Sequence, residues 1–206
     1  MFMEFNISEF EIFIINRYAA SELAGSILLG KMARKVTNHS LIVNLTRHCM
    51  EEARHAFVWY DIIKKLKIPI IEIHDVKGEN YFFHVNETKD IFEFLAFTHI
   101  FEQRVPFHFS IHAKWTKSPH IKEVLEKLIP EEEPHLAWIK AYLEKEIERG
   151  NTKVKDVLER FAKLEKDLYY EDLEKLEKTG GEAADYARTI KEHTKEFEDN
   201  PKWWQK

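Results

Sequence analysis

The 206-residue chain has a single cysteine, Cys49. One thiol cannot form an intrachain disulfide, and by itself it cannot supply a thiolate zinc site or an iron–sulfur cluster. An excess of basic residues is also missing, because 31 Lys and Arg are outnumbered by 36 Asp and Glu, for a net charge of −5. This balance gives no reason to expect a nucleic-acid partner.

Long apolar runs are equally absent. No stretch reaches the roughly 18 consecutive apolar residues expected of a membrane-spanning helix, so we expect no membrane partner. The opening segment, MFMEFNISEFEIFIINRYAA, is apolar but carries acidic residues and no basic region, which does not resemble a signal peptide. The composition, 44% hydrophobic and 33% charged, is ordinary for a globular protein. We therefore expect a cytoplasmic location.

Helical periodicity covers most of the chain and predicts an all-α fold. Four long helices are expected at residues 8–35, 38–67, 88–117 and 119–149, as two consecutive pairs. Residues 68–87 contain two β-prone runs and form a connection long enough for a crossover between parallel helices. We predict a four-helix domain over residues 1–150, followed by a charged helical extension over residues 151–206.

The extension is expected to form two helices, at residues 152–178 and from the Gly180-Gly181 pair to about residue 198. The first of them carries an apolar stripe, which would pack against the four-helix domain or against a second copy, so a homodimer stays open. Inside the fourth long helix, Pro130 and Pro134 each remove a backbone donor and crowd the preceding turn. We expect a kink, a π-bulge or a break there.

Two Glu-x-x-His triplets stand out, Glu52–His55 and Glu132–His135. Each lies on an apolar stripe of its predicted helix, since residues three and four apart share one helix face. A carboxylate on a buried face must be paired or must bind a metal ion, because burying an isolated charge costs several kcal/mol. The triplets are therefore candidate metal ligands.

A glutamate precedes each triplet by the same 30 residues: Glu22 precedes Glu52, and Glu102 precedes Glu132. Glu22 has small or apolar neighbours in the sequence, and Glu102 lies on an apolar stripe. Four carboxylates and two imidazoles can hold two divalent ions and neutralise their charge, and these donors suit iron or manganese. The candidate metal ligands are Glu22, Glu52, His55, Glu102, Glu132 and His135.

One Glu from each of two helices and Glu-x-x-His from each of two others resembles the ligand plan of ferritin-like di-iron and di-manganese proteins. The resemblance implies a ferritin-like four-helix bundle holding two Fe ions, a mixed Mn/Fe pair or two Mn ions, with Glu52 and Glu132 bridging. The segment EEARH is also similar to a (D/E)-E-x-R-H signature of di-iron oxygenases. That similarity implies that Glu51, Arg54 and Glu131 orient imidazole N–H groups. The segment EEEPH departs from the signature, since Pro134 replaces the arginine.

The resemblance implies an oxidoreductase in which two metal ions activate O2 or H2O2. An aromatic-rich region over residues 81–109, together with the small residues Gly25 and Ser26 one turn after Glu22, would leave room for a small apolar substrate. An electron donor protein is a further expected partner. No catalytic residue is predicted beyond the metal ligands.

Other functions remain open at this stage. Ferritin-type iron storage with ferroxidase activity and rubrerythrin-like peroxide detoxification use similar ligands, although a single cysteine excludes an attached rubredoxin domain. Haem is not implied, because Ala53 stands where bacterioferritins carry a haem-binding methionine. A purely structural bundle with surface glutamates and hydrogen-bonded core histidines is the plainest alternative. His48, one turn before Glu52, would orient a ligand or serve as a core histidine.

Overall fold

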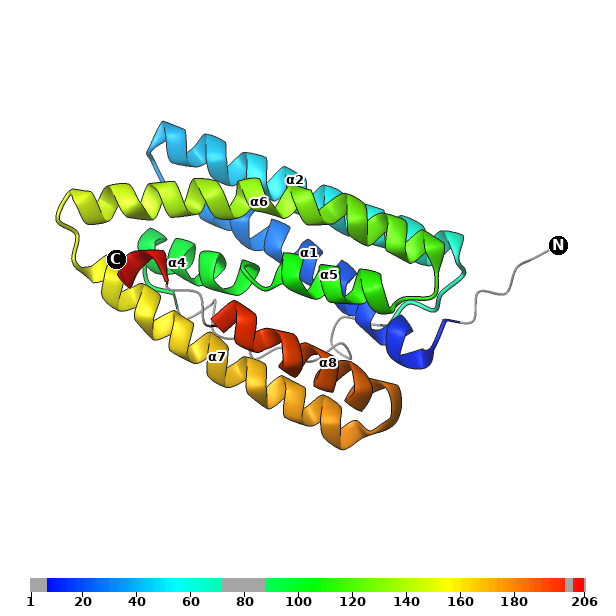
Figure 1. The fold of residues 1–206 in the computed structure, drawn as a ribbon. Helices are drawn as coiled ribbons and strands as arrows, with labels where there is room; N and C mark the ends of the chain where they lie inside the picture. Colours follow the sequence, from blue (N-terminus) through cyan, green and yellow to red (C-terminus); the bar gives the residue numbers. More distant parts are fainter. Residues whose placement is uncertain (1–6, 72–87, 199–201, 206) are drawn as a thin grey trace. The chain divides into compact units, whose positions relative to one another are not determined.

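The computed structural model describes residues 7–71, 88–198 and 202–205. This part of the chain is all-α, which confirms the predicted class (Figure 1). The elements are α1 (Glu9–Ala33), α2 (His39–Lys65), α4 (Ile91–Glu102), α5 (Val105–Trp115), α6 (Pro119–Glu148), α7 (Lys153–Thr179), α8 (Gly181–Glu198) and the 3-10 helix η1 (Trp203–Gln205). Most of the predicted crossover, residues 72–87, lies outside the described residues.

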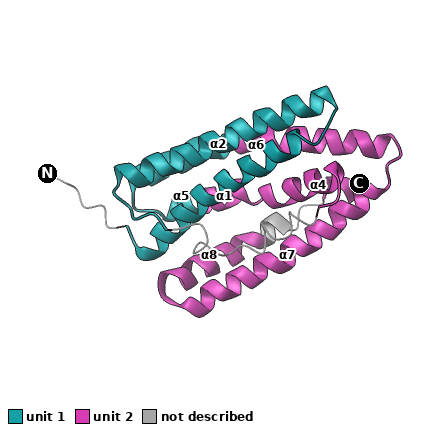
Figure 2. Cartoon of the chain, turned by 180° about the vertical axis from the view of Figure 1, so that it is seen from behind, with its two compact units in different colours: residues 1–77, 112–131 teal, residues 78–111, 132–206 magenta. Residues whose placement is uncertain are grey.

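The chain divides into two compact units (Figure 2). Unit 1 comprises residues 1–77 and 112–131, and unit 2 comprises residues 78–111 and 132–206. The division falls within two helices, between Ile111 and His112 of α5 and between Glu131 and Glu132 of α6. The domain boundary placed at residue 150 from the sequence stays a prediction.

Unit 1 is built on α1 and α2, which lie side by side (Figure 2). Both begin at a side-chain cap: Ser8 Oγ accepts from the Glu11 amide at 3.1 Å, and Asn38 Oδ1 accepts from the Leu41 amide at 3.0 Å. The apolar stripe predicted for α2 is buried throughout, with Leu41, Leu45, His48, Glu52, His55, Trp59 and Ile62 all in the core.

Asn16 ties the chain that follows α2 back onto α1. Its Nδ2 donates to the carbonyls of Ile12 at 2.9 Å and Pro69 at 3.1 Å, and its Oδ1 accepts from the Ile71 amide at 3.0 Å. The side chain is buried, at 2% exposure. The Pro69 carbonyl and the Ile71 amide follow the end of α2 and have no partner in a helix, so Asn16 supplies their hydrogen bonds.

Among the described helices, α1 is long and apolar enough to cross a membrane by length and composition alone. A buried helix in a protein core meets the same criterion. Three polar side chains of α1, those of Glu11, Asn16 and Glu22, are buried in the structure. Their burial within unit 1 favours the core role for this helix.

The helix predicted at residues 88–117 is wrong, because two helices occupy that stretch. Residues Gln103 and Arg104 form a turn between α4 and α5. The reason is Pro106, which has no amide hydrogen and whose ring would clash with the carbonyl of Glu102 four residues earlier. The candidate ligand Glu102 is therefore the last residue of α4.

The break or π-bulge expected at Pro130 and Pro134 is also wrong, since α6 is helical from Pro119 to Glu148. Both prolines lie on the exposed side of the helix. Pro130 has no amide hydrogen to donate to the carbonyl of Glu126, and Glu126 is exposed as well. Water can satisfy carbonyls on that side, so the missing donors cost less than they would in the core.

Unit 2 contains α4, α7 and α8. The α7 stripe packs within the unit, where Val154, Leu158 and Phe161 are buried and Phe161 meets Phe97 of α4. Arg104, in the turn after α4, forms a bidentate ion pair with Glu165 of α7, with Nη2 3.0 Å from Oε2. Both side chains are buried. Fork geometry of this kind offsets much of the cost of burying the two charges.

The C-terminal tail is anchored in unit 2 by two indoles. Trp203 Nε1 donates to His99 Nε2 at 2.9 Å, and Trp204 Nε1 donates to Glu159 Oε1 at 2.9 Å. His99 must be neutral at Nε2 to accept this bond. Burial, together with the ammonium groups of Lys140 and Lys202, lowers the pKa of His99 to about 4.

We predict that Asn16→Ala lowers the free energy of unfolding by about 2 kcal/mol, because it removes three hydrogen bonds of a buried side chain and leaves backbone groups at Pro69 and Ile71 without this partner. Chemical denaturation measures the change. Thr46→Ala, an exposed substitution on α2, is the control and should change stability by less than about 0.5 kcal/mol. Equal effects of the two substitutions would contradict the role given to Asn16.

We also predict that unit 2 loses stability as the pH falls from about 6.5 towards 4, because the folded state disfavours protonation of His99. Between pH 7 and pH 5 the His99 contribution is about 2 kcal/mol. His99→Gln should remove this part of the pH dependence of unfolding. Exposed His120→Gln should retain it, and a slope that His99→Gln leaves unchanged would refute the assignment.

Candidate metal centre

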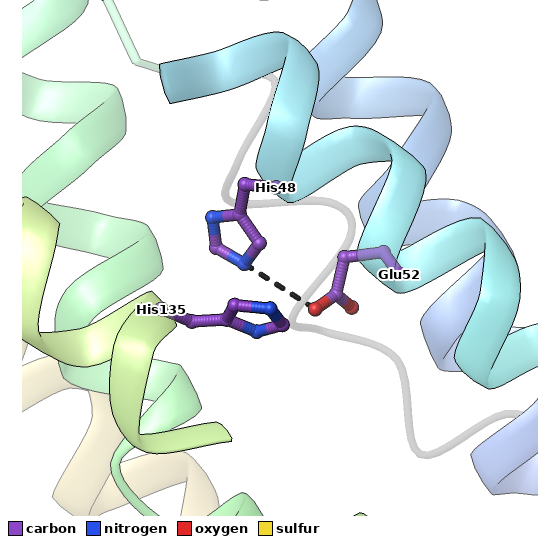
Figure 3. A group of neighbouring side chains, drawn as sticks. All are labelled: His48, Glu52 and His135. Atoms are coloured by element: carbon purple, nitrogen blue, oxygen red, sulfur yellow. Dashed lines mark ion pairs between the residues drawn. The ribbon is translucent and has the colours of Figure 1, made fainter. Parts of the chain in front are cut away.

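Unit 1 buries two carboxylates and two imidazoles from α1 and α2. Glu22 is 6% exposed, Glu52 5%, His48 1% and His55 0%. His48 Nε2 lies 3.3 Å from Glu52 Oε1, one turn along α2 (Figure 3), and His55 Nδ1 lies 3.7 Å from Glu22 Oε2 of α1. This is a buried Glu/His cluster that could bind a metal ion.

The orientation of His55 is fixed by Glu131 of α6, which belongs to the same unit. His55 Nε2 is 3.2 Å from Glu131 Oε2, and Glu131 in turn pairs with the guanidinium of Arg54. The sequence predicted that Glu51, Arg54 and Glu131 would orient imidazole N–H groups. Glu131 does contact the ring of His55, and Arg54 contacts Glu131, whereas the role of Glu51 stays a prediction. Although burial alone would raise the pKa of Glu131, the hydrogen bond and charge of Arg54, with His55, lower it.

An ionised Glu131 accepts a hydrogen bond from Nε2–H of His55, and in the neutral ring the lone pair is then on Nδ1. That nitrogen faces the carboxylate of Glu22 at 3.7 Å, a distance too long for a direct hydrogen bond. Two electron-rich atoms held in this way suit a cation bound by both. A carboxylate behind a metal-binding histidine is the usual means of fixing its tautomer.

Glycine at position 25 makes room for the carboxylate of Glu52. A Cβ placed on Gly25 would lie 3.3 Å from Glu52 Oε2. The space beside Gly25 is therefore filled by Glu52, where the sequence suggested room for a substrate. Ser26 is likewise engaged, since its Oγ donates to the carbonyl of Cys49 at 3.0 Å.

Aromatic side chains of unit 1 pack together one helical turn from Glu22 and His55. Trp59, one turn after His55, is fully buried and packs on Tyr18 with ring centroids 5.1 Å apart. Tyr18 also lies 5.6 Å from the ring of His112, whose Nε2 is 3.1 Å from Glu11 Oε1. This packing keeps bulk water away, and electrostatic interactions in such surroundings are stronger than in water.

Unit 2 contributes a second, smaller group. Glu132 and His135 of α6 are 2% and 1% exposed, and His135 Nδ1 lies 3.5 Å from Glu132 Oε2. Their three-residue spacing places both on one face of the helix, as the sequence predicts. Glu102, at the end of α4, is half-buried. Five of the six candidate ligands are therefore fully buried.

Two features of the site were hard to predict from the sequence. The sequence left open whether His48 is a core histidine or part of the site, and its four-residue spacing from Glu52 was the one indication of the contact between them. The closeness of Gly25 to Glu52 left no signal, because the two residues lie on different helices.

We predict that in the metal-free protein the neutral form of the His55 ring carries its proton on Nε2, which long-range proton–nitrogen NMR spectra can observe. Glu131→Ala should produce a mixture of tautomers, because the acceptor that selects Nε2–H is lost. Glu133→Ala, at an exposed position on the same helix, is the control. A wild-type spectrum with the proton on Nδ1 would show that Nδ1 is not available as a ligand.

No family model, curated protein or solved structure matches this chain. The interpretation of the site therefore depends on its own residues.

Proposed function

We propose that the chain is a ferritin-like carboxylate protein that binds two divalent transition-metal ions and acts as an oxidoreductase towards O2 or peroxide. The observation that carries the proposal is the His55–Glu22 pair. A buried imidazole, oriented by Glu131 and Arg54, presents Nδ1 towards a buried carboxylate 3.7 Å away. A structural core histidine has no need of this arrangement, whereas a metal ligand does.

In the proposed site, Glu22 and His55 of unit 1 hold one metal ion, and His48 and Glu52 of the same unit hold the other (Figure 3). Each pair combines hard carboxylate oxygen with imidazole nitrogen, donors that suit iron, manganese or a mixed pair. Glu132 and His135 of α6 stay candidate ligands on the ground of the sequence pattern. This ligand set adds His48 to the six residues proposed from the sequence and leaves the role of Glu102 to experiment.

Bound iron or manganese would supply the capacity to activate O2 or peroxide. The chain's own residues determine the conditions for that chemistry. Glu131 and Arg54 keep the His55 ring in one tautomer and orientation. Trp59 and Tyr18 exclude water from one side of the cluster. Carboxylates on α1 and α2 balance the positive charge that enters with the metal ions.

Metal titration tests the proposal directly. Metal-free protein titrated with Fe(II) under nitrogen is expected to bind two ions per chain and to oxidise both when O2 is admitted. His55→Ala and Glu52→Ala should each reduce the bound metal by one ion or weaken its binding by more than about tenfold. Glu133→Ala, at an exposed position, should bind two ions as the wild type does.

Several outcomes would count against the proposal. Full metal binding by both variants would place the site elsewhere. Uptake of many ions per chain would indicate iron storage, and failure to bind any metal ion would leave a structural bundle.

The ligand set is tested by the pair His48→Ala and Glu102→Ala. We predict that His48→Ala lowers the affinity for one ion by more than about tenfold, because an imidazole 3.3 Å from Glu52 is removed. If Glu102→Ala causes that loss and His48→Ala does not, the six-ligand set inferred from the sequence is correct, and His48 is a packing residue.

A further inference from the structure

The last residues of the chain are held by side chains of α4 and α7 within unit 2. The 3-10 helix η1 lies beside these two helices (Figure 1). Trp203 Nε1 donates to His99 Nε2 of α4 at 2.9 Å. Trp204 Nε1 and Gln205 Nε2 both donate to Glu159 Oε1 of α7, at 2.9 Å and 3.0 Å. Three consecutive side chains are therefore each held by a specific acceptor.

The surroundings of Trp203 fit an indole at both its edge and its face. His99 accepts the indole N–H and meets the ring edge-on, with ring centroids 5.7 Å apart. Burial lowers the pKa of His99 to about 4, so at neutral pH the imidazole keeps this acceptor. The ammonium of Lys140, on α6, lies 5.7 Å from the centroid of the Trp203 ring, and indole is the aromatic ring that a cation attracts most strongly. A phenyl ring would keep the contact with Lys140 but would lose the hydrogen bond.

The indole of Trp204 is bound by a carboxylate. Its side chain is 3% exposed, and a buried indole N–H needs an acceptor. Glu159, at an exposed position of α7, supplies that acceptor and bonds the amide of Gln205 through the same oxygen. Hydrogen bonds to a carboxylate are stronger than those between neutral groups. The contacts of the tail thus depend on N–H donors, which distinguishes them from packing of an apolar stripe.

We propose that α4, α6 and α7 form a recognition site for an indole-bearing segment, which the chain's own C-terminal tail fills and which the tail of a second copy can fill in exchange. Exchange of an identical segment needs no new kind of contact, because each hydrogen bond made between copies is one that forms within a single copy. A tethered tail has an effective concentration on the order of millimolar, so its own site keeps it in dilute solution. The tail site involves no metal ion, and its failure would leave the proposed function untouched.

Peptide binding tests the site. The full chain carrying Trp203→Ala and Trp204→Ala has an empty site and should bind a fluorescein-labelled KWWQK peptide, the sequence of residues 202–206, as measured by fluorescence anisotropy. The wild type should bind it at least about tenfold more weakly, because its own tail competes. A peptide with phenylalanine at both tryptophan positions should lose more than about tenfold in affinity, because the N–H donors are missing. No binding to the emptied chain, or equal binding of the two peptides, would overturn the proposal.

The acceptor and the fold have their own controls. In the emptied chain, Glu159→Ala should weaken peptide binding by more than about tenfold, whereas Glu174→Ala, at an exposed position further along α7, should not. If circular dichroism shows that the alanine variant is unfolded, Trp203→Phe/Trp204→Phe replaces it, since it keeps both aromatic rings and removes the two donors. That variant should bind the peptide more tightly than the wild type does, and equal binding would contradict the site.

A mixture of two full-length variants tests the exchange. Trp203→Ala/Trp204→Ala keeps the site but has no competent tail, whereas Glu159→Ala keeps the tail and has a weakened site. Fluorescence energy transfer between the two, each labelled with a different dye, should appear in the mixture and should disappear when excess KWWQK peptide is added. Absence of transfer, or transfer that the peptide does not remove, would show that tails are not exchanged between copies.

Discussion

Two carboxylates buried between α1 and α2 impose the main constraint on unit 1. Ionised glutamates at 5% and 6% exposure are costly unless positive charge or hydrogen-bond donors reach them. The surrounding features follow from that requirement. Gly25 gives Glu52 its space, and imidazoles on α2 lie beside both carboxylates. The pair Arg54–Glu131 then orients one of those imidazoles.

The chain accommodates buried charge in two different ways. Arg104 and Glu165 in unit 2 form a forked ion pair, stacked on Tyr169, in which each group meets its opposite charge directly. Such a pair is complete without a ligand. In unit 1, Glu22 and Glu52 are approached by His55 and His48, groups that carry charge only when protonated. This contrast is the physical reason for proposing a cation in unit 1 and a structural role for the ion pair of unit 2.

The sequence was sufficient for those parts of the structure that depend on local spacing. The caps at Ser8 and Asn38 and the buried stripe of α2 were predictable because they follow from residues one to four positions apart. The contact of Glu131 with His55 was anticipated by a motif. The break between α4 and α5 was not predicted, because helical periodicity continues on both sides of Pro106 and does not show where one helix ends and the next begins. The continuous course of α6 through Pro130 and Pro134 depended on which side of the helix faces solvent, a fact that only the fold supplies.

The other features needed tertiary structure. The tail anchor of Trp203 on His99 joins residues that are distant in the sequence and share no motif. The exposure of Val43, Met50 and Phe57 on α2 could not be separated from burial by periodicity alone, because a seven-residue repeat marks a helix face without saying what covers it.

The close approach of Gly25 to Glu52 links two positions that are otherwise unrelated in the sequence. The two residues share one volume, so the side chain allowed at one depends on the length of the acid at the other. A chain with aspartate at position 52, shorter by one methylene group, could accept alanine at position 25. With glutamate at 52, alanine would displace the carboxylate by a few tenths of an ångström. In sequences descended from this one, positions 25 and 52 are therefore expected to covary, and that covariation would identify the two residues as neighbours in the site.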